Sequence, residues 1–212
     1  MRAWIWFCAF LFTTVSAFAG EADVIKLPPP QTTGGMPLMQ TLAARHSSRV
    51  FAKRPLEPQQ LSNLLWAGFG VNRADSDKRT APSARDWREI DIYVALADGT
   101  YVYDPVANVL RRVLARDVRA LTGMQDFVAV APLNLVYVAN YQRMGGAMEA
   151  DKDFYAAADT GFIAQNVYLY CASAGLNTVV RGSVDRVALT AALNLTPQQR
   201  IILAQTVGYP PK

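Results

Sequence analysis

The chain has 212 residues, of which 51% are hydrophobic and 18% are charged, and its formal net charge is +4. This composition excludes a disordered or fibrous chain and fits one globular domain with a core of ordinary size. The positive excess is mild and comes without runs of Lys or Arg, so it gives no reason to expect a nucleic-acid partner.

The first 19 residues have the pattern of a secretory signal peptide. Arg2 precedes an uncharged apolar run over residues 3–18, and an Ala-Phe-Ala cleavage site stands at residues 17–19. We expect cleavage after this site and a mature protein in the periplasm or secreted. An uncleaved segment, near the lower length limit for spanning a bilayer, would instead hold the protein at the membrane. Cleavage would also remove Cys8 and leave Cys171 as the only cysteine, so we expect no internal disulfide.

Residues 20–37 form a stretch with little apolar periodicity. Pro28-Pro29-Pro30 and Gly34-Gly35 favour an extended N-terminal arm. Such an arm is either a tether or a segment that wraps a partner subunit. Residues 38–212 are expected to form the globular domain.

Two helices are predicted at the start of this domain. The first begins near Pro37 and runs into Arg45, and the second begins at Pro58 and ends at Gly70. Residues 72–83 are polar and resemble a loop.

Strands and a further helix are expected in the middle of the domain. Residues 90–95 and 100–103 are rich in β-forming side chains, and the turn residues Ala97-Asp98-Gly99 between them favour a hairpin. Residues 107–121 look helical. The dense apolar run at residues 133–140 is typical of a central strand.

A long helix is predicted from about Asp151 to Ala174, with Gly175 at its C-cap. The remaining elements are expected to be a strand at residues 176–180, a helix opened by Ser183 and Asp185, and a last strand at residues 201–209. Thr196-Pro197-Gln198-Gln199 starts either a short helix or the turn into that last strand. This order indicates an α+β fold with a mixed sheet covered by helices.

The strongest local signal is the segment Arg45-His46-Ser47-Ser48-Arg49. Two guanidiniums, an imidazole and a hydroxyl within five residues at a helix end can converge on one oxyanion, and the planar fork of arginine suits phosphate. A solvated helix end, whose cations complement the helix dipole, explains the same residues. The residues by themselves leave both interpretations open.

With Val50 and Phe51 added, this segment resembles the signature that opens FMN-dependent proteins of the nitroreductase family. That signature has Arg, then Arg or His, Ser, any residue, Arg or Lys, any residue and Phe. The resemblance implies that four side chains contact the phosphate and ribityl chain of FMN: Arg45, His46, Ser47 and Arg49. The single histidine would then bind the cofactor rather than act as a general base.

A second segment, Arg79-Thr80-Ala81-Pro82-Ser83-Ala84, is similar to one in the azoline-oxidase branch of the same family. The resemblance implies that Pro82, Ser83 and Ala84 lie against the flavin ring. Many members continue with asparagine and glutamine, whereas this chain continues with Arg85-Asp86-Trp87-Arg88-Glu89. Aspartate near the flavin pyrimidine would disfavour the anionic reduced flavin and arginine would favour it. An exposed charged turn before a strand fits the same residues.

The stretch from Gly161 to Gly175 resembles the long dimer-forming helix of the family. Its apolar residues recur at helical spacing, so Cys171 is expected to be a small core residue rather than a nucleophile. In the family the turn after the next strand donates a backbone N–H to flavin N5, which implies that role for Arg181 and Gly182. Gly182 permits the close backbone approach that this contact needs.

The end of the chain, Val207-Gly208-Tyr209-Pro210, resembles the family's Val-Gly-x-Pro ending, and Lys212 is a candidate for a basic residue that returns to the phosphate. The matches together imply a nitroreductase-like fold, with a mainly antiparallel sheet flanked by helices, assembled as a homodimer. No Ser-His-Asp set or metal cluster stands out.

The implied activity is that of an FMN-dependent oxidoreductase. It would work by ping-pong hydride transfer through flavin N5, to or from a small-molecule substrate such as a nitroarene or quinone. The alternative is a non-catalytic periplasmic binding protein that retains the fold. Two features favour this alternative: the chain is short for the family, and NAD(P)H is not expected outside the cytoplasm.

Overall fold

The computed structural model describes residues 23–212. The predicted signal peptide, residues 1–19, and the start of the arm lie outside the described residues. The helices are α1 (Leu38–Ala44), α2 (Pro58–Phe69), α3 (Phe127–Val130), α4 (Glu149–Ala174) and α5 (Arg186–Ala192). The strands are β1 (Val24–Lys26), β2 (Val71–Arg73), β3 (Lys78–Arg79), β4 (Ile90–Leu96), β5 (Gly99–Asp104), β6 (Val109–Leu114), β7 (Leu133–Asn140), β8 (Asn177–Arg181) and β9 (Gln199–Gly208).

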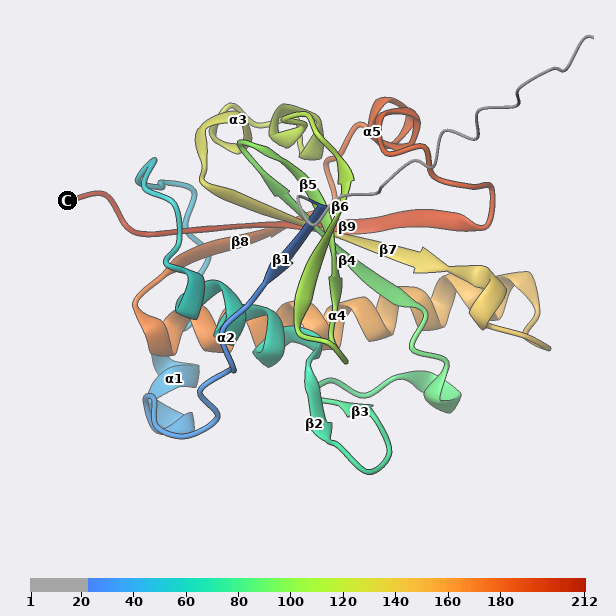
Figure 1. Ribbon diagram of the computed structural model, residues 1–212, viewed down its shortest axis with the longest axis horizontal. Coiled ribbons are helices and arrows are strands. Elements are labelled where there is room, and N and C mark those ends of the chain that lie inside the picture. Colours follow the sequence, from blue (N-terminus) through green and yellow to red (C-terminus); the bar gives the residue numbers. More distant parts are fainter. Residues whose placement is uncertain (1–22) are drawn as a thin grey trace, which may run out of the picture.

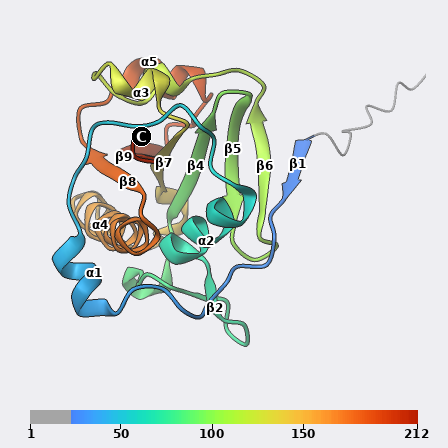
Figure 2. The same ribbon diagram turned by 90° about the vertical axis from the view of Figure 1, so that its left-hand side faces the viewer.

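Seven strands form one sheet between two layers of helices. Their order is β1-β6-β5-β4-β7-β9-β8, and each neighbouring pair runs antiparallel. Helices α1, α2 and α4 lie on one side of this sheet and α3 and α5 on the other (Figures 1 and 2). The predicted α+β fold with a mainly antiparallel sheet is confirmed.

Strand β4 shows why the sheet needs helices on both faces. Ile92 and Val94 belong to the core cluster shared with α2 and α4, whereas Tyr93 and Ala95 belong to the cluster shared with α5. Successive side chains of a strand point to opposite faces, so a strand that is apolar on both faces must be covered twice. The apolar run of β7 divides between the two clusters in the same way, as predicted for a central strand.

The predicted turn and cap residues have the expected geometry. Ala97 and Asp98 reverse the chain between Leu96 of β4 and Gly99 of β5. Gly175 ends α4 in the left-handed conformation, with φ of 67°. Asp185 caps α5 by accepting a hydrogen bond from the Ala188 N–H at 2.9 Å. Cys171 is fully buried in the core, as expected.

The helix expected at residues 107–121 is wrong, because β6 and a short 3-10 helix occupy this region. Asp104 accepts hydrogen bonds from two backbone N–H groups of the following turn, and Asn108 adopts a left-handed φ of 51°. The reversed chain then pairs along β5 and buries Leu110. Long-range strand pairing therefore overrides the local helical pattern. At residues 196–199 the chain makes the turn into β9, with the Thr196 N–H and hydroxyl donating to the Gln199 side chain.

The described part of the arm lies along its own domain. Strand β1 pairs with β6 at the edge of the sheet. The Pro28 carbonyl accepts hydrogen bonds from Ser62 Oγ at 2.5 Å and Asn108 Nδ2 at 2.9 Å. Strand β1 is therefore the edge strand of the sheet, and the hydrogen bond from Ser62 anchors the arm to α2. Among residues 23–212, no helix has both the length and the apolar character needed to span a bilayer.

Gly208 is predicted to be essential for packing at the end of β9. A Cβ at this position would lie 2.9 Å from two ring carbons of Pro132 and 3.3 Å from Phe51, and a proline ring has little freedom to move. We expect Gly208→Ala to lower the free energy of unfolding by about 1–3 kcal/mol in urea denaturation. Gly182→Ala is the matched control, since its nearest neighbour would lie at 3.9 Å. Equal stability of the two variants would contradict this packing argument.

Candidate functional site

The segment predicted to bind phosphate leaves the end of α1 and runs beside β8. Arg45 has extended backbone angles, φ −60° and ψ 121°, so the helix stops there. Ser48 N–H donates to the Thr178 carbonyl at 2.9 Å, and Asn177 Nδ2 donates to the Val50 carbonyl at 2.8 Å. His46 Nδ1 lies 2.9 Å from the Ala44 carbonyl. The chain is thus attached to the sheet just after Ser47, and before Ser47 it is held to the end of α1.

Tyr168 of α4 connects this segment to the turn that follows β8. Its hydroxyl oxygen accepts a hydrogen bond from Val180 N–H at 2.9 Å and lies 2.8 Å from Ser47 Oγ. Because that oxygen already accepts one hydrogen bond, its own proton is available for Ser47. No sequence motif indicated this residue, since a tyrosine in a buried helix has no local signal of such a role.

Arg45 and Arg49 present two uncompensated positive charges. The Arg45 guanidinium lies over the Tyr168 ring, 5.2 Å from its centroid, and Arg49 is exposed. Among the described residues neither arginine forms an ion pair. A cation–π contact orients a guanidinium without neutralising it. This pair can therefore receive an anion.

The Arg181 side chain points into the protein, so only its backbone is left for the predicted contact with the flavin. The side chain is 5% exposed and its guanidinium donates to Thr122 O at 2.5 Å, Thr206 Oγ1 at 2.9 Å and Asn134 Oδ1 at 3.1 Å. Burial lowers the pKa of Arg181 to about 10. The charge of this side chain is enclosed within the protein. Gly182 next to it is exposed, and a Cβ there would meet its nearest neighbour, Leu203, only at 3.9 Å.

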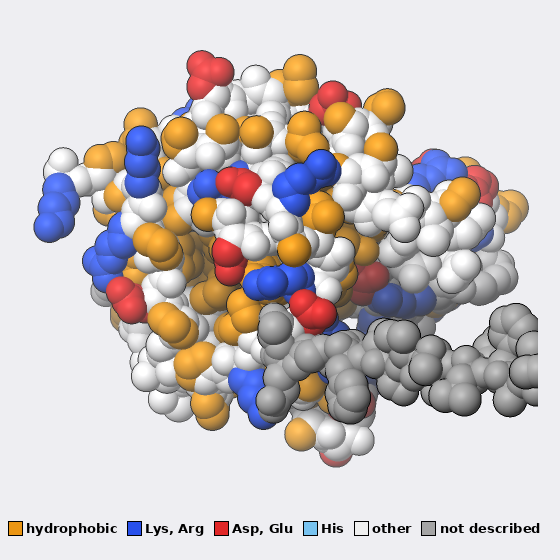
Figure 3. Space-filling view, turned by 45° about the horizontal axis from the view of Figure 1, so that its top comes forward, with side chains coloured by type: hydrophobic (Ala, Val, Ile, Leu, Met, Phe, Trp, Pro, Cys, Tyr) orange, Lys and Arg blue, Asp and Glu red, His pale blue; other side chains and the backbone are white. Residues whose placement is uncertain are grey.

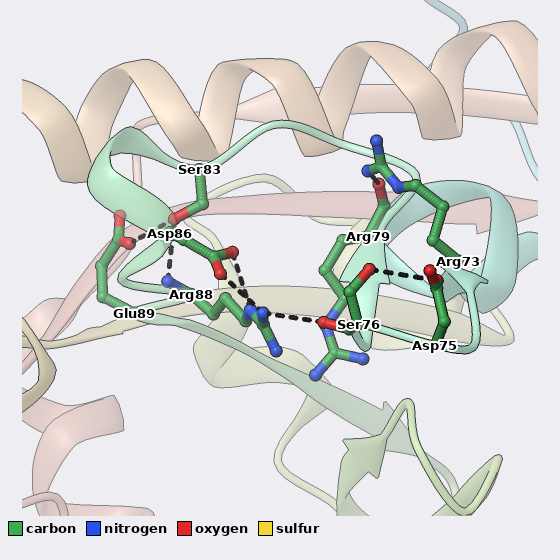
Figure 4. Close-up of polar contacts among 8 residues, drawn as sticks. All are labelled: Arg73, Asp75, Ser76, Arg79, Ser83, Asp86, Arg88 and Glu89. Atoms are coloured by element: carbon green, nitrogen blue, oxygen red, sulfur yellow. Dashed lines mark hydrogen bonds and ion pairs between the residues drawn. The ribbon is translucent and has the colours of Figure 1, made fainter.

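The loop at Pro82, Ser83 and Ala84 is held by buried side chains. Ser83 Oγ accepts from Arg88 N–H at 2.8 Å and donates to Glu89 Oε2 at 3.2 Å (Figure 4). Ala84 N–H donates to Asp159 Oδ2 of α4 at 2.8 Å. Pro82 itself is exposed.

The continuation of this loop is strained and contains an internal ion pair. Arg85, Asp86 and Arg88 all have positive φ, between 49° and 57°, which L-residues rarely adopt outside constrained sites. Arg88 Nη2 pairs with Asp86 Oδ2 at 2.6 Å and lowers the pKa of that carboxyl (Figure 4). Arg85 stacks on Trp87 at 5.3 Å. Asp86 and Arg88 thus neutralise each other.

Glu89 is a fully buried carboxyl that no sequence motif indicated. Burial, together with the nearby charge of Asp159, raises the pKa of Glu89 to about 7. Its Oε1 atom has no hydrogen-bond partner among the described residues. Glu89 and Asp159 together form the polar base on which the loop at Ser83 rests.

The two loops predicted to bind flavin lie on opposite sides of α4. Asp159, which holds Ala84, and Tyr168, which contacts Ser47, are nine residues apart on this helix. That separation is two and a half turns, roughly 14 Å along the axis and about half a turn around it. The loop at Ala84 and the segment at Ser47 of one protomer therefore do not form one continuous surface.

The C-terminal segment returns to the chain just after Arg49. The Tyr209 carbonyl accepts a hydrogen bond from Ala52 N–H at 2.9 Å, and the Arg54 guanidinium lies 4.4 Å from the centroid of the Tyr209 ring. Lys212 is exposed beyond this contact. The structure thus brings the first and last predicted motifs together.

On the face drawn in Figure 3, basic and acidic side chains are interspersed.

The buried Glu89 carboxyl predicts a pH-dependent stability. Its pKa is higher in the folded than in the unfolded chain, so the folded state is favoured at low pH and loses stability as the pH rises from about 4.5 to about 7. We expect a loss on the order of 2 kcal/mol between pH 5 and pH 8, measured by urea denaturation, that is absent in Glu89→Gln. The exposed Glu57→Gln is the control and should behave like the wild type. A Glu89→Gln variant with the full wild-type decline would refute this origin.

Comparisons with known proteins agree with this geometry. The model of the Nitroreductase family matches residues 42–209. A predicted nitroreductase of Methanocaldococcus jannaschii is 35% identical over 175 residues, which cover 77% of this chain and 86% of that protein. The crystal structure of a predicted nitroreductase from Ralstonia eutropha has a TM-score of 0.86 and 49% identity, with 90% of each chain covered. The NADPH:FMN oxidoreductase of Vibrio harveyi shares the fold, with a TM-score of 0.62, 20% identity, and 82% of this chain and 69% of that one covered. The chain belongs to the nitroreductase family, whose members are flavoproteins, and is an oxidoreductase.

Proposed function

We propose that this oxidoreductase uses FMN, whose phosphate binds between Arg45 and Arg49. The observation that carries the proposal is the pair of guanidiniums without carboxylate partners, in a segment bonded to β8 and, through Tyr168, to the backbone at Val180. A phosphate would supply the missing negative charge through paired, charge-assisted hydrogen bonds. The name of the Vibrio harveyi relative supports FMN as the flavin.

The other predicted residues would hold the remaining parts of the cofactor. His46 and Ser47 would contact the phosphate and ribityl chain, and Lys212 would add a further positive charge. Gly182 is exposed and has no side chain, which fits a close approach of its backbone to the flavin ring. Bound FMN supplies hydride transfer at N5, in a ping-pong cycle, to or from a small organic substrate such as a nitroarene or quinone. The residues of this chain bind and orient it.

We further propose that the flavin site is completed by a second copy of the chain. One protomer holds its loop at Ala84 and its segment at Ser47 on opposite sides of α4, so one FMN would contact both kinds of loop only across two subunits. The outward face of α4 supports this, because it exposes 68% of Phe154 and 48% of Phe162. A Cβ added at Gly161, on the same face, would have no neighbour within 4 Å. Exposed aromatic residues of this size indicate an interaction surface.

The phosphate assignment predicts that FMN binding depends on two arginines. The purified wild-type protein should have a flavin absorbance spectrum, and Arg45→Ala combined with Arg49→Ala should weaken FMN affinity about a hundredfold or more in a fluorescence titration. Arg116→Ala removes an exposed arginine elsewhere and should have no effect. Unchanged affinity in the double variant would refute the phosphate assignment. Colourless wild-type protein that does not take up FMN would refute the flavin proposal.

The shared site predicts that dimerisation and flavin binding are lost together. We expect Phe162→Asp to convert a dimer into a monomer in light scattering and to release FMN, because the charge would be buried in the interface. Val187→Asp is the matched control, since Val187 is 84% exposed on α5, away from α4. A monomeric variant that keeps its FMN would contradict the shared site.

A further inference from the structure

A second site is formed by a cavity of about 490 Å³ where β4, β5 and the end of α2 meet. Part of its wall is apolar and aromatic, with Phe69, Ile92 and Tyr103. The rest carries two aspartates, Asp91 and Asp104, and four arginines: Arg79, Arg88, Arg111 and Arg143. Cavities of this volume, apolar with a few polar groups, are typical of small-molecule sites.

Three of these arginines are already paired. Arg88 pairs with Asp86 at 2.6 Å, Arg111 with Asp104 at 2.8 Å and Arg143 with Asp91 at 2.9 Å. Within residues 23–212 the fourth, Arg79, forms no ion pair.

The Arg79 guanidinium is also short of hydrogen bonds. Its Nε and Nη1 atoms are buried without a partner among the described residues, and the group lies 5.7 Å from the centroid of the Phe69 ring. In Figure 4 it lies beside the guanidinium of Arg88, which reaches Asp86 and Ser76. Burial, and then the charge of Arg88, lower the pKa of Arg79. Buried donors without acceptors destabilise a protein, so an anion at this position would be stabilising.

We propose that this cavity binds the carboxylate of a small organic acid with an aromatic or apolar body. The Arg79 fork would donate to the planar carboxylate, which matches its geometry, while the body would pack on Phe69 and Ile92. The apolar wall favours such an acid over inorganic phosphate, which has no apolar part.

This proposal goes beyond the flavin assignment, because neither Arg45 nor Arg49 lines the cavity and binding of the acid needs no cofactor. Arg79 and Arg88 also line a smaller cavity of about 290 Å³ together with Pro82 and Ser83. The acid therefore lies near the loop predicted to contact the flavin ring. A role for the acid as a substrate rests on the proposed function, whereas its binding does not.

Benzoate and its neutral analogue benzyl alcohol provide the test. Benzoate should raise the Tm of the wild-type protein and bind in calorimetry, whereas benzyl alcohol and inorganic phosphate should bind at least tenfold more weakly. Arg79→Gln should weaken benzoate binding at least tenfold, and the exposed Arg116→Gln should not. The wild-type comparison of benzoate with benzyl alcohol decides the question even where a variant fails to fold.

Equal binding of benzoate and benzyl alcohol, tighter binding of phosphate than of benzoate, or unchanged benzoate affinity in Arg79→Gln would each overturn the proposal. The flavin assignment is tested separately. Colourless protein whose benzoate binding depends on Arg79 would support the acid site and refute the flavin proposal. Yellow protein whose benzoate binding does not depend on Arg79 would support the flavin proposal and refute the acid site.

Discussion

The packing of α4 against the sheet is the constraint on which the rest of the candidate site depends. One edge of its buried face carries Asp159, which accepts the Ala84 N–H, and the other carries Tyr168, which joins Ser47 to the backbone at Val180. Asp159 and Tyr168 thus connect one rigid helix to both loops. Because a packed helix cannot rotate without disrupting its core, the two loops keep fixed positions relative to the sheet.

Hydrogen bonds and ion pairs separate the structural arginines from those available to ligands. Arg181 is deeply buried, yet its guanidinium donates to a carbonyl, an amide oxygen and a hydroxyl, so it holds three segments together. Arg88 is paired with a carboxylate. Arg45, Arg49 and Arg79 have no carboxylate partner among the described residues. Since a desolvated cation without a partner is costly, the half-buried members of this group support the two anion sites that we propose.

The loop after Ser83 combines strain with buried polar support. Three residues with positive φ would be unfavourable in a free loop, but hydrogen bonds to Ser83 and the packing of Trp87 on Tyr155 hold the chain in this shape. This loop departs from the usual family pattern. Because Asp86 and Arg88 neutralise each other, the main contribution of these two residues is to the shape of the loop. Glu89 beneath it supplies a carboxyl whose pKa is raised by burial to about 7, so that it titrates near neutral pH.

The sequence by itself determined the helices and strands whose signals are local. The caps at Gly175 and Asp185, the Ala97-Asp98 turn and the apolar run of β7 depend on a few adjacent residues, and the ordered motifs indicated the family. Only the tertiary structure decided that β6 is a strand, that Arg181 points into the protein and that Arg79 lacks a partner among the described residues. Pairings such as Arg143 with Asp91 join residues far apart in the chain. Strand pairing, burial and the compensation of charge are set by such distant neighbours, which local periodicity does not encode.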